Sequence, residues 1–104
     1  MSDNDKVIQT IFEVIEEINP GIPESRRLNK SPDTVLFGEG GSLDSLGLVN
    51  FIVTTEQKIQ ESFGVTVVLA DEKAMSLRNS PFRTVQTLAE YVSVLLKERN
   101  NGHG

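Results

Sequence analysis

Apolar residues recur with a helical period in three segments of the chain. In residues 5–19, 44–63 and 84–99 they gather in one arc of a helical wheel, and mostly polar side chains fill the opposite arc. The pattern therefore predicts three amphipathic helices. The apolar positions are Val7, Ile8, Ile11, Phe12, Val14, Ile15 and Ile18 in the first; Leu48, Val49, Ile52, Val53, Ile59 and Phe63 in the second; and Val85, Leu88, Ala89, Tyr91, Val92, Leu95 and Leu96 in the third.

Proline and glycine mark where these helices end. The Asn-Pro-Gly sequence at 19–21 is expected to stop the first helix, and Gly64 the second. Residues 20–43 are rich in proline and glycine and are predicted to form a loop. So long a loop is uncommon in a small domain unless it is packed or functional. We expect its apolar residues to pack it across the helices: Leu28, Val35, Leu36 and Phe37.

The segment between the second and third long helices is less regular. Residues 65–69 have strand propensity, but no second strand candidate pairs with them, so an extended connector is expected. Asp71 can cap a short helix that runs to about Met75 or Leu77. The predicted fold is an all-α four-helix bundle, with three long helices and one short helix, over residues 1–99. Residues 100–104 are expected to be a disordered tail.

The composition of the chain disfavours several classes of function. The chain has no cysteine, and its single histidine, His103, lies in the predicted tail, which disfavours thiol or histidine catalysis and metal clusters. The net charge of −5 disfavours nucleic acid as a partner. No apolar run approaches the ~20 residues that span a bilayer, and the Ser-Asp-Asn-Asp sequence at 2–5 is unlike a signal peptide. A cytoplasmic, monomeric protein is the expectation.

One short motif carries possible chemistry. Leu43-Asp44-Ser45-Leu46 lies where the glycine-rich loop ends and the second long helix begins. Asp44 and Ser45 could simply cap that helix, since both residue types are preferred N-caps. Alternatively, a phosphodiester on Ser45 would be stabilised by ~0.3–1 kcal/mol beside the positive end of the helix dipole. Leu46 and Val49 are then expected to turn toward the core and line the entrance of a crevice.

Four pieces of sequence together resemble the acyl carrier protein family, which includes peptidyl and D-alanyl carriers. They are Leu-Phe-Gly at 36–38, Leu-Asp-Ser-Leu at 43–46, Glu-Ser-Phe-Gly at 61–64 and Pro-Phe-Arg-Thr-Val at 81–85, in an order and spacing that run from residue 36 to residue 85. The resemblance implies that a separate phosphopantetheinyl transferase attaches 4'-phosphopantetheine covalently to Ser45. Asp44 would help to orient the transferase and its metal. Ser42 lies in the loop and lacks the motif around it.

The resemblance also implies a non-catalytic carrier, with acyl or aminoacyl thioesters as cargo. A loading ligase and downstream synthases of fatty acid, polyketide or lipid biosynthesis would be its partners. No residue near Ser45 in the sequence could act as its general base within a Ser-His-Asp arrangement, so a hydrolase is disfavoured. An unmodified helical adaptor, in which Asp44 and Ser45 only cap a helix, is the alternative.

The second long helix departs from the family pattern, because the usual row of acidic residues is missing. Glu56 falls within the apolar arc and is expected to tie the helix to a neighbouring segment. Phe51 is predicted to point outward, where it either contacts a partner or covers the long loop. Such a face favours a dedicated set of partners. The predicted partner-binding residues are Gly47, Asn50, Phe51, Thr54 and Lys58.

Overall fold

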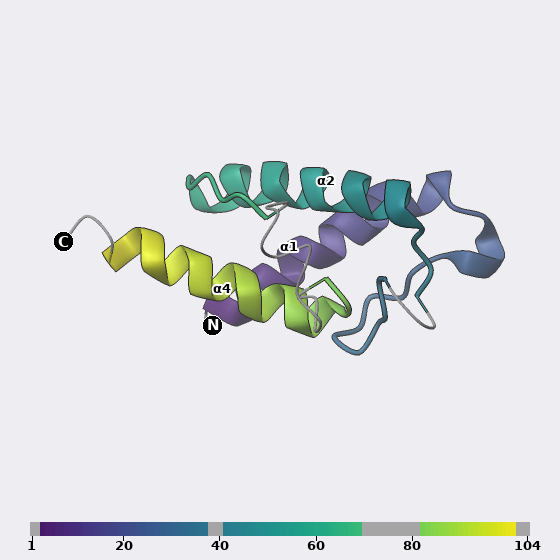
Figure 1. Cartoon of the computed structure of the whole chain (residues 1–104), viewed down its shortest axis with the longest axis horizontal. Helices are drawn as coiled ribbons and strands as arrows, with labels where there is room; N and C mark the ends of the chain where they lie inside the picture. The colour runs from purple at the N-terminus through teal and green to yellow at the C-terminus, as the bar shows by residue number, and fades with distance from the viewer. Residues whose placement is uncertain (1–2, 38–40, 70–81, 102–104) are drawn as a thin grey trace.

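The computed structural model describes residues 3–37, 41–69 and 82–101 (Figure 1). Its helices are α1 (Asp3–Ile18), α2 (Ser45–Phe63) and α4 (Val85–Asn101), with two 3-10 turns, η1 (Asn19–Gly21) and η2 (Glu24–Arg26). These described ranges contain no β-strand, only an isolated antiparallel bridge between Val35 and Thr84. The all-helical prediction is confirmed.

Two parts of the predicted fold, the short helix and the start of the tail, are not seen as predicted. The short helix after Asp71 lies outside the described residues, so three helices of the predicted four are seen. Residues 65–69 form neither helix nor strand, as expected of a connector. Helix α4 continues to Asn101, so residues 100 and 101 belong to it and not to the predicted tail.

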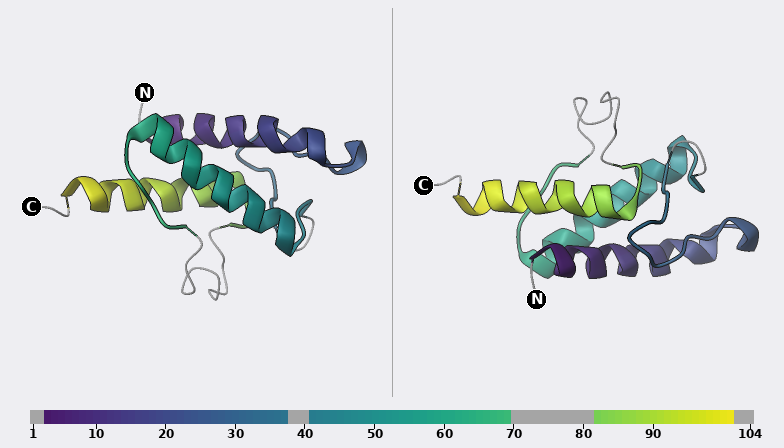
Figure 2. Two further views of the ribbon diagram at one scale, coloured as in Figure 1. Left: turned by 90° about the horizontal axis from the view of Figure 1, so that it is seen from above. Right: turned by 90° about the horizontal axis from the view of Figure 1, so that it is seen from below.

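Helix α1 packs against both of the other long helices. Helices α2 and α4 both run opposite to α1, and α2 crosses the other two obliquely (Figure 2). The apolar stripes meet in one core, to which the connector adds Val67 and Leu69. The fully buried apolar residues of the three helices are Val7, Ile11, Val14 and Ile15; Phe51, Ile52 and Ile59; and Val85, Leu88, Ala89 and Val92.

The predicted helix ends are confirmed. The Asn19 side chain follows α1 and forms a pair of hydrogen bonds with the backbone of Leu28, donating from Nδ2 to its carbonyl oxygen and accepting from its amide, both at 2.9 Å. Gly64 ends α2 with a φ of 67°, and its amide donates to the Gln60 carbonyl at 2.9 Å. A left-handed residue at this position is the usual place for glycine.

The loop between α1 and α2 is packed, as predicted. Its carbonyl groups at Thr34 and Pro32 accept hydrogen bonds from the amides of Val85 and Gln86, at 3.1 and 2.9 Å. The first amides of a helix have no partner within the helix, so the loop satisfies two donors at the start of α4. Leu28 and Leu36 are buried, whereas Val35 and Phe37 are half-buried.

The rotation of α2 was predicted wrongly. Phe51 is fully buried instead of outward, and Val49 and Val53 are exposed instead of buried. Phe51 buries far more apolar surface than a valine, so a helix turned to bury it is favoured. Thr55 can share this face because its hydroxyl donates to the Phe51 carbonyl at 2.7 Å. The buried face of α2 is therefore Leu48, Phe51, Ile52, Thr55 and Ile59.

Candidate functional site

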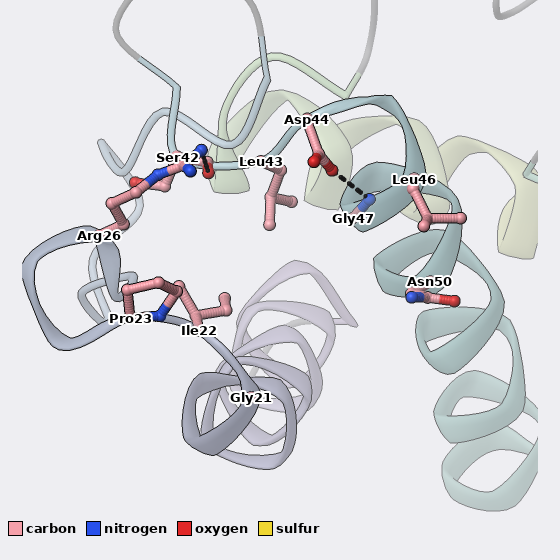
Figure 3. Close-up of a pocket in the computed structure, with 10 residues that line it drawn as sticks. All are labelled: Gly21, Ile22, Pro23, Arg26, Ser42, Leu43, Asp44, Leu46, Gly47 and Asn50. Atoms are coloured by element: carbon pink, nitrogen blue, oxygen red, sulfur yellow. Dashed lines mark hydrogen bonds between the residues drawn. The ribbon is translucent and has the colours of Figure 1, made fainter.

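Asp44 is the N-cap of α2, and Ser45 is the first residue of that helix. The backbone of Asp44 is extended, with φ −84° and ψ −176°, and its Oδ1 accepts a hydrogen bond from the Gly47 amide at 2.7 Å (Figure 3). This is the geometry of an aspartate cap. The capping role predicted for Asp44 is confirmed, and it is compatible with a second role in modification.

Gly47 allows close packing in the first turn of α2. A Cβ at this position would lie 3.1 Å from Asp44 Oδ1 and 3.4 Å from Leu43 Cδ2. The first of these contacts is tighter than side chains normally make, so a larger residue would press on the capping carboxylate. Glycine at this position therefore has a local packing reason.

A cleft opens between the end of α1 and the start of α2, and both neighbours of Ser45 lie on it. Two overlapping cavities of about 230 and 310 Å³ make up this cleft, which we call the α1–α2 cleft. Figure 3 shows Ile22 and Leu43 pointing into it from opposite sides. Its lining residues are Ile18, Gly21, Ile22, Pro23, Arg26, Ser42, Leu43, Asp44, Leu46, Gly47 and Asn50.

Polar groups stand on the rim of the α1–α2 cleft. The guanidinium of Arg26, in η2, donates from Nη2 to the Ser42 carbonyl at 2.8 Å and so joins the two ends of the long loop. Asn50 is exposed on the second turn of α2 and lies across the cleft from Arg26 (Figure 3). Nothing in the sequence pattern singles out Arg26, because its place beside Ser42 depends on how the loop folds back.

The predicted partner-binding residues do not share one exposed face. Gly47 and Asn50 line the cleft, Phe51 lies in the core, and Thr54 and Lys58 are half-buried. A different group is exposed: Leu46, Val49 and Val53 show 72%, 44% and 43% of their surface. The expectation that Leu46 and Val49 turn toward the core is therefore wrong. Their spacing of three and four residues places them on one side of α2, and we call them the α2 apolar strip.

Lys58 is paired with α1 and not free for a partner. Its ammonium lies 3.2 Å from Glu17 Oε2. That hydrogen bond and the charge of Glu17 raise the pKa of Lys58 above its ordinary value, and Glu61 and Glu13 add smaller contributions. Lys58 therefore joins two helices electrostatically.

Glu56 ties α2 to the connector, as predicted. Its Oε2 accepts a hydrogen bond from the amide of the fully buried Leu69 at 2.7 Å. The extended segment after Gly64 is thereby held against α2.

Other kinds of site find no support in the described part of the chain. It has no group of three or more potential metal-ligating side chains. None of its helices combines the length and apolar character needed to cross a membrane. No protein-family model, curated protein or solved structure matches this sequence.

Proposed function

We propose that this chain is a carrier protein that holds acyl or aminoacyl intermediates as thioesters on a 4'-phosphopantetheine arm linked to Ser45. The observation that carries the proposal is the place of Ser45: it is the first residue of a long helix, directly after a capping aspartate and between two residues that line a cleft. The four pieces of sequence that resemble acyl carrier proteins point to the same residue.

The proposed modification is a phosphoryl transfer from coenzyme A. The Ser45 hydroxyl oxygen bonds to the phosphorus that bears the pantetheine, and the bond from that phosphorus to the adenosine part breaks. Adenosine 3',5'-bisphosphate leaves, and the hydroxyl proton passes to a base of the transferase. The thiol at the free end of the arm then accepts the cargo as a thioester. The carrier itself supplies the Ser45 hydroxyl and the surface that the transferase reads.

The dipole of α2 supports this position for a phosphodiester. The amides at the start of a helix carry partial positive charge, which favours a negative group there by ~0.3–1 kcal/mol. Asp44 satisfies one of these amides, that of Gly47.

The test is intact mass measurement after incubation with coenzyme A, Mg²⁺ and a broad-specificity phosphopantetheinyl transferase. We expect wild type to gain the mass of one phosphopantetheine group. Ser45→Ala should gain none, whereas Ser42→Ala, a serine change in the same region, should be modified like wild type. A wild-type chain left unmodified by several transferases would contradict the proposal.

The second candidate function is an unmodified helical adaptor. Two observations favour it: the Asp44 carboxylate is already explained as a cap, and the α2 apolar strip offers an exposed surface. An adaptor requires no arm, so the same mass measurement separates the two candidates. A partner that binds unmodified protein and loses affinity for Val49→Ser would then support the adaptor.

A further inference from the structure

We infer that the α1–α2 cleft is the resting site of the pantetheine part of the arm. In this arrangement the arm folds back from Ser45 between the end of α1 and the first turns of α2. This inference rests on the proposed function, because it needs an arm on Ser45.

The cleft begins where the arm would begin. Asp44 and Leu46, the two neighbours of Ser45, both line it. It then continues past Gly47 and Leu43 toward Ile22 and Pro23. An arm attached at its edge reaches it without any change in the fold, and the tether makes the local concentration of the arm high.

The charges of the lining favour a neutral ligand. Among the described residues, Arg26 and Asp44 are the charged side chains of the lining, and they have opposite signs. The lining therefore has no excess of either charge, which suits the uncharged pantetheine. The phosphodiester is bonded to Ser45 and stays at the start of α2.

The polar and apolar groups of the cleft lining also match those that follow one another along pantetheine. Next to its phosphate, pantetheine carries a carbon with two methyl groups, which suits the apolar side chains of Ile22 and Leu43. A hydroxyl and two amides follow. Arg26 can donate to their oxygens, since its described hydrogen bond to Ser42 uses one of five guanidinium donors. Asn50 can both donate and accept.

The size of the cleft is sufficient for the arm. Drug-sized ligands occupy cavities of about 300–1,000 Å³. The two neighbouring cavities that make up the cleft, about 230 and 310 Å³, together fall within that range. A thin chain with a few polar groups can lie along such a cleft.

The experiment compares apo and holo protein by NMR, with holo protein prepared by a transferase and verified by intact mass. If the inference is right, arm attachment shifts the amide signals of Gly21, Ile22 and Asn50 as well as those beside Ser45. Nuclear Overhauser contacts should join the paired methyl groups of pantetheine to the Ile22 side chain.

Two matched pairs of variants test whether Arg26 and Asn50, on the rim of the α1–α2 cleft, contact the arm. Arg26→Ala should reduce the arm-induced shifts at Gly21 and Ile22, whereas Arg83→Ala, an exposed arginine away from the cleft, should leave them unchanged. Asn50→Ala and Gln57→Ala form a second pair on α2, in which only Asn50 lines the cleft. All four positions are exposed, so the fold should persist, and the apo spectra check this.

The outcomes separate this inference from the proposed function. A chain that gains no mass overturns both. If the arm attaches but shifts only the amide signals of residues 43–48, without contacts to Ile22, the arm does not rest in the α1–α2 cleft. The proposed carrier function would still hold. If Arg26→Ala and Arg83→Ala show equal arm-induced shifts at Gly21 and Ile22, Arg26 does not contribute to the binding of the arm.

Discussion

At the scale of single residues, the capping role of Asp44 can be separated by substitution from the role in modification proposed for it. Its carboxylate caps α2 through the Gly47 amide. Asparagine caps helices about as well as aspartate, whereas alanine does not. We expect Asp44→Ala to lower the free energy of unfolding by about 0.5–2 kcal/mol and Asp44→Asn to change it little. Urea denaturation followed by circular dichroism measures both.

The same pair of variants tests the role of Asp44 in modification. If its negative charge helps to orient the transferase and its metal, both variants should accept the arm more slowly than wild type. The rate is followed by intact mass at intervals. An Asp44→Asn protein that is modified at the wild-type rate would limit Asp44 to capping.

Gly41 and Gly21 give a second prediction at this scale. A Cβ on Gly41 would lie 2.8 Å from Phe37 Cα and 2.9 Å from the Leu36 carbonyl oxygen, so backbone would have to move. We expect Gly41→Ala to cost about 1–3 kcal/mol of unfolding free energy, as overpacking typically does. Thermal and urea denaturation measure the loss.

Gly21→Ala is the matched control for that variant. A Cβ at Gly21 meets nothing within 4 Å, and its φ is not positive. Alanine there should leave stability unchanged or raise it by up to about 1 kcal/mol, through the lower entropy of the unfolded chain. Equal losses in the two variants would contradict the close packing around Gly41.

Individual residues differ in how far the sequence predicts them. Glu56 could be assigned a structural role, because a carboxylate within an apolar arc needs a partner wherever that partner lies. Phe51 was wrongly predicted to point outward, because an apolar arc that includes Val49 and Val53 turns Phe51 away from the core, whereas it is fully buried. The sequence pattern did not single out Arg26, since its contact with Ser42 depends on the path of the loop.

At the scale of elements, Lys58 and Glu17 join α2 to α1. The partner raises the pKa of Lys58 in the folded protein above its value in the unfolded chain. The pair therefore stabilises the fold at neutral pH, and this contribution is lost as the pH rises through the raised pKa in the alkaline range. We expect the stability difference between wild type and Lys58→Gln to shrink there, in denaturation measured from neutral to alkaline pH.

Lys97→Gln controls for the general effect of removing a positive charge, because Lys97 is exposed on α4. Added salt should also reduce the difference for Lys58, since salt screens exposed ion pairs. A Lys58→Gln effect that persists at high pH would show that its alkyl chain, and not its charge, is what stabilises the contact.

Helix ends were easier to predict than helix orientation. Gly64 acts through its own backbone and the Gln60 carbonyl, and the Asn-Pro-Gly sequence at 19–21 is itself a local stop signal, so local sequence specifies both ends. The hydrogen bonds of Asn19 to Leu28 could not be predicted in this way, because the two residues are joined only through the fold of the loop. The rotation of α2 depends on which side α1 and α4 cover, and that is settled by the whole core. The α1–α2 cleft is harder still, because its walls come from segments about twenty residues apart and no periodic pattern connects them.

At the scale of the molecule, α1 holds the bundle together because it packs against both α2 and α4. A cavity in α1 should therefore destabilise all three helices at once. Ile11 is fully buried there, and Ile11→Ala should cost about 2–5 kcal/mol of unfolding free energy. The chain offers a convenient probe of α4, since Tyr91 is its only tyrosine and it has no tryptophan.

Two signals followed during the same urea titration test this coupling. Circular dichroism reports all the helices, and Tyr91 fluorescence reports α4, where the ring packs edge-on to Phe82 with centroids 6.3 Å apart. The two transitions should coincide in wild type and shift together to lower urea in Ile11→Ala, as two-state unfolding requires. Val94→Ala, at an exposed position on α4, should leave both nearly unchanged. A fluorescence transition that separates from the dichroism signal would mean that α4 unfolds without α1, and the bundle would then lack the common core described here.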